Sequence, residues 1–590
     1  MNLRLFGGYN DQEQDYSNFR GSLNMGKRFA NNKIGLILNG NYQKANRSSD
    51  GLSADISYRS VTQDGKAILG YDNFNLSDQI ETRLRYGASA VLDYRLPRGE
   101  IVLNSIYSAT DRDEIRRRRR YRLASQYQEY DIRDRQNDTD LFSNILSGNH
   151  TIGRDLQIEW RTSLSSTSQT TPYLVSSRFR ELGAFTAIDD TNLESIIGAA
   201  KNNLDETHLK EVVSDDMDVS TTNYTAQLDL KKPFKLSNTI GGYIKLGGKM
   251  RNDDRKRDVS QFWSGSFGTD DIAERYPERF DLDSRGRIRM SNFIGDFNAS
   301  DFADGAFFLG PGPDVNGPHL SEARSNEWFK TYRNEPEFIF NPEVDQGDYQ
   351  VRETVYAGYV MAEVNIKKLI LLGGVRNEYT QGEYFAKVGS SAGDDNEEES
   401  QFKTRDTTAT NSYNSLLPMA HLRYKFTDWF DVRLAYTQTI NRPNYLSLAP
   451  FRQRNTNQRR INQGVSNLKN TASHNYDMFL SFYNDIGLLT FGAFYKEINN
   501  IDYIRQGVIV SGDPNLLGYQ LIQPENSLGT TEVKGVEIDL QMRFTFLPSV
   551  LSGIVFSSNV SLIDSKTFYP FTRVERNPTR VINDVREGKW

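Results

Sequence analysis

Segments in which every second residue is apolar run through this chain, and they constrain its fold more than any other feature. In residues 431–437, Val432, Leu434 and Tyr436 fall on one face. The other face carries Arg433. A period of two is typical of a β-strand, because successive side chains point to opposite faces. An arginine in the middle of the polar face needs water or a partner, so we expect strands with lipid or core on one side and water on the other.

Tight turns join these segments in pairs, which predicts eight hairpins. The turns lie near residues 29–33, 97–99, 153–155, 232–234, 367–368, 427–428, 484–487 and 547–549. Between hairpins the connections are long, at roughly 45–82, 111–138, 170–220, 258–348, 381–411, 443–474 and 499–529. A transmembrane β-barrel has this asymmetry, with short periplasmic turns and long outer loops. The two ends of a soluble sandwich have no reason to differ so consistently.

The number of strands is informative in itself. Residues 2–9 form a lone leading segment, and eight hairpins bring the total to about seventeen strands. Single-chain bacterial barrels close with an even number of strands, and an open edge in lipid leaves backbone polar groups unpaired. We therefore expect an all-β fold, an antiparallel up-and-down transmembrane β-barrel, of which this sequence covers only a part.

Composition narrows the class of protein further. Aromatic residues make up 12% of the 590 residues and charged residues 25%, which favours an aromatic girdle and large polar loops. No segment approaches the roughly 18 consecutive apolar residues of a membrane-spanning helix. The net charge of −6 disfavours a nucleic-acid binder, and the absence of cysteine excludes disulfides and thiolate metal sites. Met1 leads directly into the sequence NLRLFGGYN without a secretion signal, so we expect the natural N-terminus to lie upstream.

The block at residues 422–451, LRYKFTDWFDVRLAYTQTINRPNYLSLAPF, adds a more specific pattern. Its strand ends where proline removes a ladder donor. The block resembles the barrel signature of TonB-dependent outer-membrane receptors, a strand followed by a corner that here consists of Arg442, Pro443, Tyr445, Pro450 and Phe451. Residues 359–380, 471–502 and 531–544 are similar to further strands of that family, and residues 2–10 and 39–53 resemble the first hairpins of its Bacteroidetes-type members.

The resemblance implies a specific architecture. Members form a barrel of twenty-two strands that is filled by an N-terminal plug domain carrying a TonB box. Residues 1–590 would then be one partial barrel domain of about seventeen strands, without the plug and the C-terminal strands. Lumen-facing side chains such as Lys245 and Arg433 would contact the plug, while Val432 and Leu434 would face lipid.

The resemblance also implies a function. It places the chain in the outer membrane of a Gram-negative bacterium, against lipid and lipopolysaccharide, with the plug, TonB and a small-molecule or oligosaccharide cargo as partners. The expected activity is TonB-dependent uptake of a scarce nutrient such as a siderophore or an oligosaccharide. The alternatives are a plugless passive porin or a surface adhesin, and then a soluble β-sandwich lectin or enzyme.

Two charge runs have more than one interpretation. The arginines at 116–120 must point to both faces of a strand, and at bilayer depth each lipid-facing arginine would cost about 2–4 kcal/mol. The run is therefore expected above the membrane, as a solvated strand extension or as a contact for lipopolysaccharide phosphates or an anionic ligand. The acidic residues 394–399 are expected to form a solvated loop in preference to a Ca²⁺ site.

Catalytic patterns are scarce. The five histidines lack metal-site spacing, and no nucleophile elbow or phosphate-binding loop occurs. We expect no enzyme activity, catalytic residue, metal or cofactor. The signature corner is expected to be structural and not a ligand site. The longest connections, 170–220 and 258–348, are the best candidates for substrate contact, where four aromatic residues either stack on a ligand or pack between loops: Trp263, Phe267, Trp328 and Tyr332.

Overall fold

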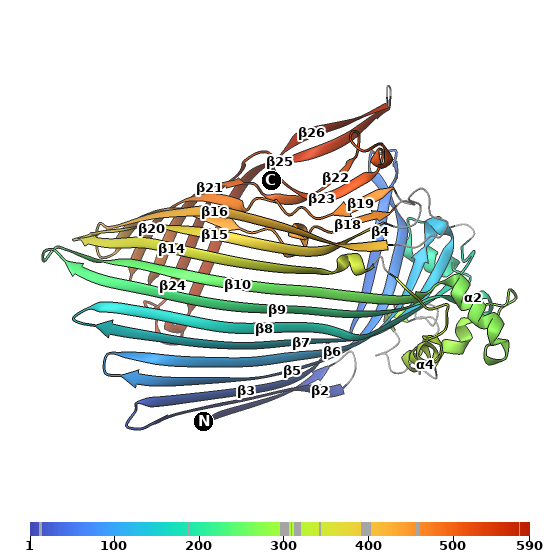
Figure 1. The fold of residues 1–590 in the computed structure, drawn as a ribbon, viewed down its shortest axis with the longest axis horizontal. Coiled ribbons are helices and arrows are strands. Elements are labelled where there is room, and N and C mark those ends of the chain that lie inside the picture. The colour runs from blue at the N-terminus through green and yellow to red at the C-terminus, as the bar shows by residue number, and fades with distance from the viewer. Residues whose placement is uncertain are drawn as a thin grey trace.

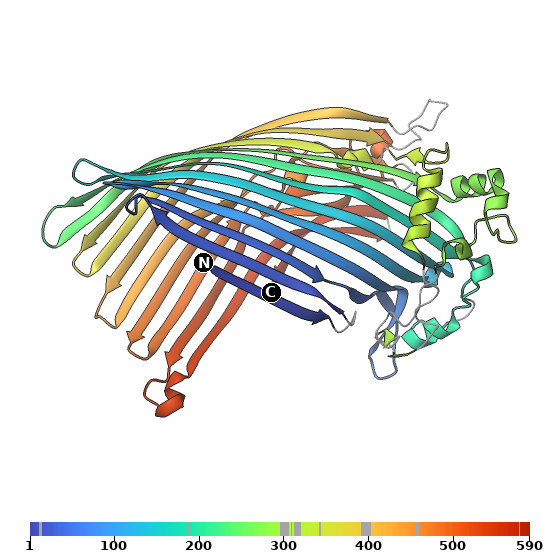
Figure 2. The ribbon, with the colours of Figure 1, turned by 90° about the horizontal axis from the view of Figure 1, so that it is seen from below.

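One curved antiparallel sheet dominates the structure. The computed structural model describes residues 1–10, 15–185, 188–295, 306–307, 310–311, 320–341, 344–390, 403–455, 459–576 and 579–589. Figures 1 and 2 show the strands curving round from the blue N-terminal edge to the red C-terminal edge. Among the described residues, no helix combines the length and the apolar content that a membrane-crossing helix needs.

Seventeen strands, counted over the described residues, form the wall, and each pairs antiparallel with the next. They are β1 (Asn2–Asn10), β2 (Asp15–Phe29), β3 (Ile34–Asn46), β5 (Ala67–Leu96), β6 (Gly99–Arg122), β7 (Tyr127–Ile152), β8 (Leu156–Glu181), β9 (His208–Lys235), β10 (Ile240–Ser264), β14 (Tyr349–Ile366), β15 (Leu369–Ser390), β16 (Lys403–Lys425), β17 (Phe430–Asn441), β20 (Thr471–Asn484), β21 (Gly487–Asn499), β24 (Thr531–Arg543) and β25 (Val555–Arg576). The predicted fold class is confirmed.

Most of the smaller elements gather at the end of the wall away from the tight turns (Figure 1), and the 3-10 turn at residues 549–553 lies in the tight turn between β24 and β25. The short strands are β4 (Ser49–Val61), β11 (Ala306–Phe307), β12 (Gly310–Pro311), β13 (Ile339–Phe340), β18 (Arg452–Asn455), β19 (Arg460–Gln463), β22 (Asp502–Val508), β23 (Gln520–Asn526) and β26 (Thr579–Lys589). The helices are α1 (Leu193–Ala199), α2 (Ser266–Arg275), α4 (Glu322–Tyr332) and α5 (Tyr445–Leu448), with 3-10 turns η1 (Leu123–Ser125), η2 (Leu204–Glu206), η3 (Pro277–Arg279), η4 (Met290–Phe293), η7 (Val344–Gly347), η8 (Pro514–Leu516) and η9 (Ser549–Gly553).

Seven of the eight predicted turns lie where the sequence places them. The exception is the turn predicted at 232–234, because β9 continues to Lys235 and the chain reverses at residues 236–239. Pro233 pairs with Tyr243 near the end of the strand, where a missing ladder donor is tolerated. The Ser237 hydroxyl then accepts hydrogen bonds from the backbone N–H groups of Thr239 and Ile240, which stabilises the later turn.

Several segments that were predicted to be long loops are largely β-strand, so this prediction is wrong for them. The segment 111–138 lies almost entirely in β6 and β7, which leaves only residues 123–126 between the two strands. The wall therefore extends far beyond the membrane. The backbone satisfies its hydrogen bonds there through the antiparallel ladder, as it does within the bilayer.

The two faces of the wall are distinguished by their side chains. In β5, Tyr86, Leu92 and Tyr94 belong to the outer face and remain exposed. The intervening Asp93 points to the lumen and binds Arg28 at 2.5 Å. Tyr86 and Tyr94 are eight residues apart, about 27 Å along a tilted strand, which is close to the ~25 Å height of the apolar band of outer-membrane barrels.

The main apolar core lies on the outer face of the wall and beyond the membrane. It joins side chains of α2, α4 and η4 to side chains of β7, β8 and β9, and Figure 1 shows α2 and α4 at this end of the wall. Trp328 of α4 is 6% exposed and lies 6.2 Å from the ring of Phe293 and 5.2 Å from the ring of Tyr332. The connection between β10 and β14 is thus folded back against the wall.

Candidate functional site

The arginine run in β6 separates into two faces, as the sequence predicts for a strand above the membrane. The outward pair is covered by other parts of the chain. Arg117 donates from Nε to the carbonyl oxygen of Leu320 at 2.8 Å and from Nη2 to Glu322 at 2.9 Å. Arg119 donates to Gln128 at 3.1 Å. The even-numbered arginines point into the lumen instead, on the same face of β6 as Glu114.

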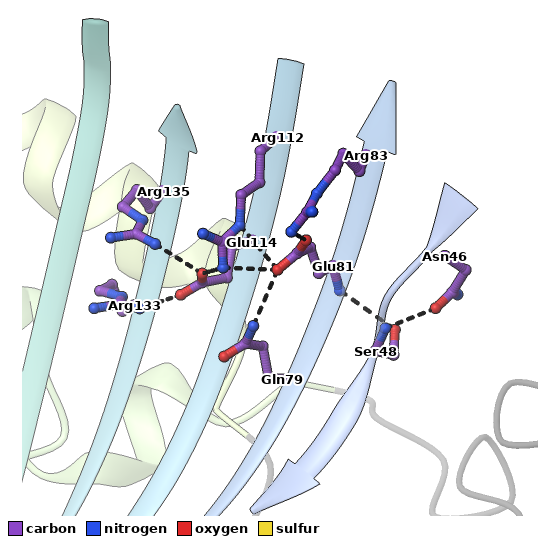
Figure 3. Close-up of polar contacts among 9 residues, drawn as sticks. All are labelled: Asn46, Ser48, Gln79, Glu81, Arg83, Arg112, Glu114, Arg133 and Arg135. Atoms are coloured by element: carbon purple, nitrogen blue, oxygen red, sulfur yellow. Dashed lines mark hydrogen bonds and ion pairs between the residues drawn. The ribbon is translucent and has the colours of Figure 1, made fainter. Parts of the chain in front are cut away.

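Two buried carboxylates form the centre of the lumen-facing site in Figure 3. Glu81 of β5 and Glu114 of β6 are opposite each other in the ladder and are 2% and 1% exposed. Like charges in that position repel. Arg112 removes the conflict because it bridges the pair, at 2.7 Å from Glu81 and 2.6 Å from Glu114.

Further arginines from β5 and β7 complete this cluster. Arg83 pairs with Glu81, while Arg133 and Arg135 of β7 both reach Glu114, the latter at 2.9 Å. Burial alone would raise the pKa of Glu114, but the hydrogen bond from Arg133 and the nearby guanidinium charges hold this pKa below its usual value. Glu114 is therefore ionised at neutral pH, in a cluster that contains more arginines than carboxylates.

Sequence reasoning missed this cluster, although a signal for it exists. A carboxylate and an arginine lie two residues apart in 81–83 and in 112–114, and two arginines do so in 133–135, which puts each pair on one face of its strand. Their meeting depends on the register between strands, which aligns Glu81 with Glu114 and Glu114 with Arg135. A search for matched charges at period two across neighbouring strands would have found it.

The signature corner folds inward against the lumen face of β14 and β15. Arg442 donates from Nη2 to Glu378 at 2.7 Å and to the Thr380 hydroxyl at 3.2 Å, and its Nε lies 3.6 Å from the fully buried Glu353. The Asn444 side chain accepts from the N–H of Leu446 and caps α5.

Two of the remaining predicted corner residues pack against a small apolar core beside β14 and β15. Pro443 is buried directly after β17. Tyr445 and Phe451 pack against a cluster that contains Tyr384 and Leu448. Pro450, which directly precedes Phe451 in the sequence, is half-buried. The structure thus brings the five residues to one place beside the wall.

Closer to the tight turns, the lumen face carries a polar recess of about 430 Å³ lined by Glu100, Glu159, Arg161, Asp229 and Lys245, among others. Lys245 binds Glu159 at 3.1 Å and lies 3.8 Å from Asp229. On the opposite part of the wall, Arg433 donates to the Tyr483 hydroxyl at 2.7 Å and to Asp431 at 3.2 Å. Both cations lie on the polar face, as their strand periodicity predicts.

The aromatic residues of the long connections have different surroundings. Trp328 and Tyr332 are buried in the outer core, so packing between loops is their role in the structure. Trp263 is half-buried and opposite Ile339 in the short β10–β13 ladder, whereas Phe267 is 88% exposed. The acidic run at 394–399 lies outside the described residues.

His208 connects β9 to the outer core and should make it sensitive to pH. Its Nε2 accepts from Arg287 at 3.0 Å, and its Nδ1 is 3.4 Å from the Glu206 carbonyl oxygen. Burial, and then the charge of Arg287, lowers the pKa of His208 to about 4. An unfolded histidine has a pKa of about 6.5. Stability from the neutral ring is therefore complete above pH 6.5 and decreases as the pH falls toward 4.

We expect η4 to exchange its backbone amides faster as the pH falls from 6.5 to 4, after correction for intrinsic exchange rates. Hydrogen–deuterium exchange with mass spectrometry measures this. His208→Gln keeps an acceptor for Arg287 but cannot be protonated, so it should lose the dependence. Equal pH dependence in both proteins would contradict the assignment.

The sequence model of the TonB dependent receptor-like β-barrel family matches residues 175–585. The chain belongs to that family. Its barrels lie in the outer membrane of Gram-negative bacteria, and the family is one of receptors and transporters rather than enzymes. No sequence among curated proteins matches this chain.

Solved structures with a similar fold have little sequence in common with this chain. The ferric-catecholate import receptor Fiu of Escherichia coli K12 in its closed form is 12% identical with a TM-score of 0.49, over 99% of this chain and 65% of Fiu. The siderophore receptor PirA of Acinetobacter baumannii is 13% identical with a TM-score of 0.46, over 97% and 66%. The Serratia marcescens hemophore receptor HasR, in complex with HasA and heme, is 11% identical with a TM-score of 0.45, over 99% and 74%. The chain spans slightly under two thirds of the length of Fiu and PirA.

Proposed function

We propose that this chain forms the barrel of a receptor that imports a scarce nutrient, such as a siderophore or an oligosaccharide, by TonB-dependent transport. The observation that carries the proposal is the lumen face, which is lined by ion pairs from the outer cluster at Glu114 to the recess at Lys245. A wall of this kind suits a hydrated passage for a polar solute. Family membership supports the same function.

We further propose that a plug domain fills the lumen in the intact receptor and that additional strands close the wall. The seventeen wall strands of the described residues support this, because single-chain bacterial barrels close with an even number of strands and unpaired strand edges are costly in lipid. The resemblance of the first hairpins to Bacteroidetes-type members remains the basis for placing the receptor in that group.

The experiment compares uptake in Gram-negative cells that carry the complete reading frame, with and without TonB. Cells are supplied separately with iron-55 siderophores and labelled oligosaccharides. Uptake of a cargo that stops when TonB is deleted, or when an uncoupler is added, supports the receptor. Uptake that persists under both treatments would identify a passive porin, and surface binding without uptake would identify an adhesin.

We also propose that the signature corner is structural. Arg442→Ala removes a charged hydrogen bond worth about 1.5–3 kcal/mol and should open the segment between β17 and β20 to protease. Arg442→Lys should rescue only partly, since an ammonium cannot imitate the planar guanidinium that reaches both Glu378 and Glu353. Limited proteolysis measures the effect. Arg352→Ala removes a half-exposed arginine of β14 as the matched control, and equal cleavage of both variants would contradict the proposal.

A further inference from the structure

Two lumen-facing arginines above the membrane oppose each other directly. Arg116 of β6 pairs in the ladder with Arg133 of β7. Like charges in this arrangement destabilise a sheet unless an anion lies between or beside them. Both side chains are about one-fifth exposed, so a solute in the lumen can reach them.

The carboxylates nearby are already occupied by other arginines. Asp131 accepts from Arg118 at 3.0 Å and from Arg120 at 2.6 Å, and it lies 3.9 Å from Arg116. Arg133 shares Glu114 with two further arginines. Asp131 therefore serves three arginines, of which Arg116 is one. Glu114 likewise serves three, of which Arg133 is one.

Unsatisfied donors point to the same shortage of negative charge. Within the described part of the chain, the Nε atoms of Arg116 and Arg133 are buried and have no hydrogen-bond acceptor. A buried donor without an acceptor costs free energy, more so on a charged group. Burial, and then the charges of Arg133 and Arg118, lowers the pKa of Arg116 to about 10. The Arg116 guanidinium shares its nearest carboxylate, Asp131, with Arg118 and Arg120.

The position of the pair decides which anion can reach it. Arg116 lies nine residues beyond Tyr107 in β6, about 30 Å along the strand. Tyr107 is an exposed outer-face residue of the membrane band. Lipopolysaccharide surrounds the outer face, whereas the pair points inward, and the outward Arg117 is covered by α4. The partly exposed side chains of the pair are therefore open to an anion dissolved in the lumen.

We propose that Arg116 and Arg133 form a binding site for an oxyanion, a phosphate or carboxylate group of a solute entering the lumen. Guanidinium groups match the geometry of these groups through paired N–H donors. The statement that this solute is the transported cargo rests on the proposed transport function. The two arginines indicate the chemical class of the ligand, which is a polar solute with at least one anionic oxygen group.

Titration of the purified full chain in detergent with inorganic phosphate, and separately with citrate, tests the site by calorimetry. Arg116→Gln should weaken binding of at least one anion about tenfold or more. Arg116→Lys should keep part of the affinity, because it keeps the charge. Asp131 retains Arg118 and Arg120 in both variants, and heat-modifiable gel mobility confirms that each barrel is folded. Arg352→Gln, an arginine of the outer face above the membrane, is the matched control and should bind like the parent.

The outcomes separate the site from the transport function. Equal affinity in the parent and in Arg116→Gln, or no binding of either anion by the parent, would overturn the site even if uptake depends on TonB. If purified lipopolysaccharide is the only competitor that abolishes the binding, the ligand is lipopolysaccharide. That result would overturn the proposal of a soluble ligand. Tenfold weaker binding in Arg116→Gln together with TonB-independent uptake would support the site and reject the receptor.

Discussion

Glu114→Gln should destabilise the outer part of the wall by about 3–5 kcal/mol, as expected when one partner of a buried ion-pair cluster is removed. The carboxylate is 1% exposed and is the shared acceptor of Arg112, Arg133 and Arg135. The amide keeps the volume but removes the charge, so Arg133 and Arg135 lose their carboxylate and only Arg112 keeps one, Glu81. Urea unfolding and amide hydrogen exchange over residues 110–136 measure the loss.

The control and the rescue make this result specific. Glu278→Gln removes an exposed carboxylate of the outer connection and should change the free energy of unfolding by less than about 0.5 kcal/mol. Adding Arg133→Gln to Glu114→Gln removes one uncompensated charge and should recover part of the stability. If Glu114→Gln exchanges its amides as slowly as the parent, the cluster does not stabilise the wall.

Trp328→Ala should cost about 3–5 kcal/mol in the docking of the β10–β14 connection, the usual range for removing a large buried aromatic side chain. The indole contacts aromatic rings of η4, α4 and the segment before β13. Its loss leaves a cavity on the outer face of β7 and β8. Amide exchange of α4 and η4 should rise strongly, while exchange in the membrane part of the same strands stays unchanged.

Phe267→Ala is the natural counterpart, because this residue of α2 is 88% exposed. It should leave the exchange of α4 within error of the parent. A similar effect of both substitutions would show that the outer core is not packed as described. Loss of cargo uptake in a folded Trp328→Ala protein with unchanged α4 exchange would instead favour a ligand contact for the indole.

The sequence could predict features that depend on local periodicity. A period of two identifies the strands, and it also assigns Arg433 and Lys245 to the lumen face, because neighbouring side chains must alternate. Tight turns near Pro97 and Gly153 follow from residues that favour chain reversal. The turn after β9 shows where local prediction fails. Pro233 predicts a turn at 232–234, but the chain reverses at residues 236–239, where the Ser237 hydroxyl accepts two backbone hydrogen bonds.

Strand length above the membrane could not be read in the same way. Residues 111–138 are as polar as a loop, yet they form strand because neighbouring strands supply ladder partners over the whole length. The inward fold of the corner is likewise non-local, since Arg442 binds Glu378 of β15, 64 residues earlier. No period in the corner itself indicates that contact.

The sequence by itself determined that this protein is a barrel wall of about seventeen antiparallel strands with a polar lumen, because alternation and turn chemistry are local. Only the tertiary structure decided where the charges meet. The ladder register brings Glu81 opposite Glu114 and Arg116 opposite Arg133, although each pair is separated in the chain. Hydrogen bonds between strands fix that register, and it gives the wall a buried cluster with more arginines than carboxylates and two opposed arginines that share Asp131 and Glu114 with other arginines.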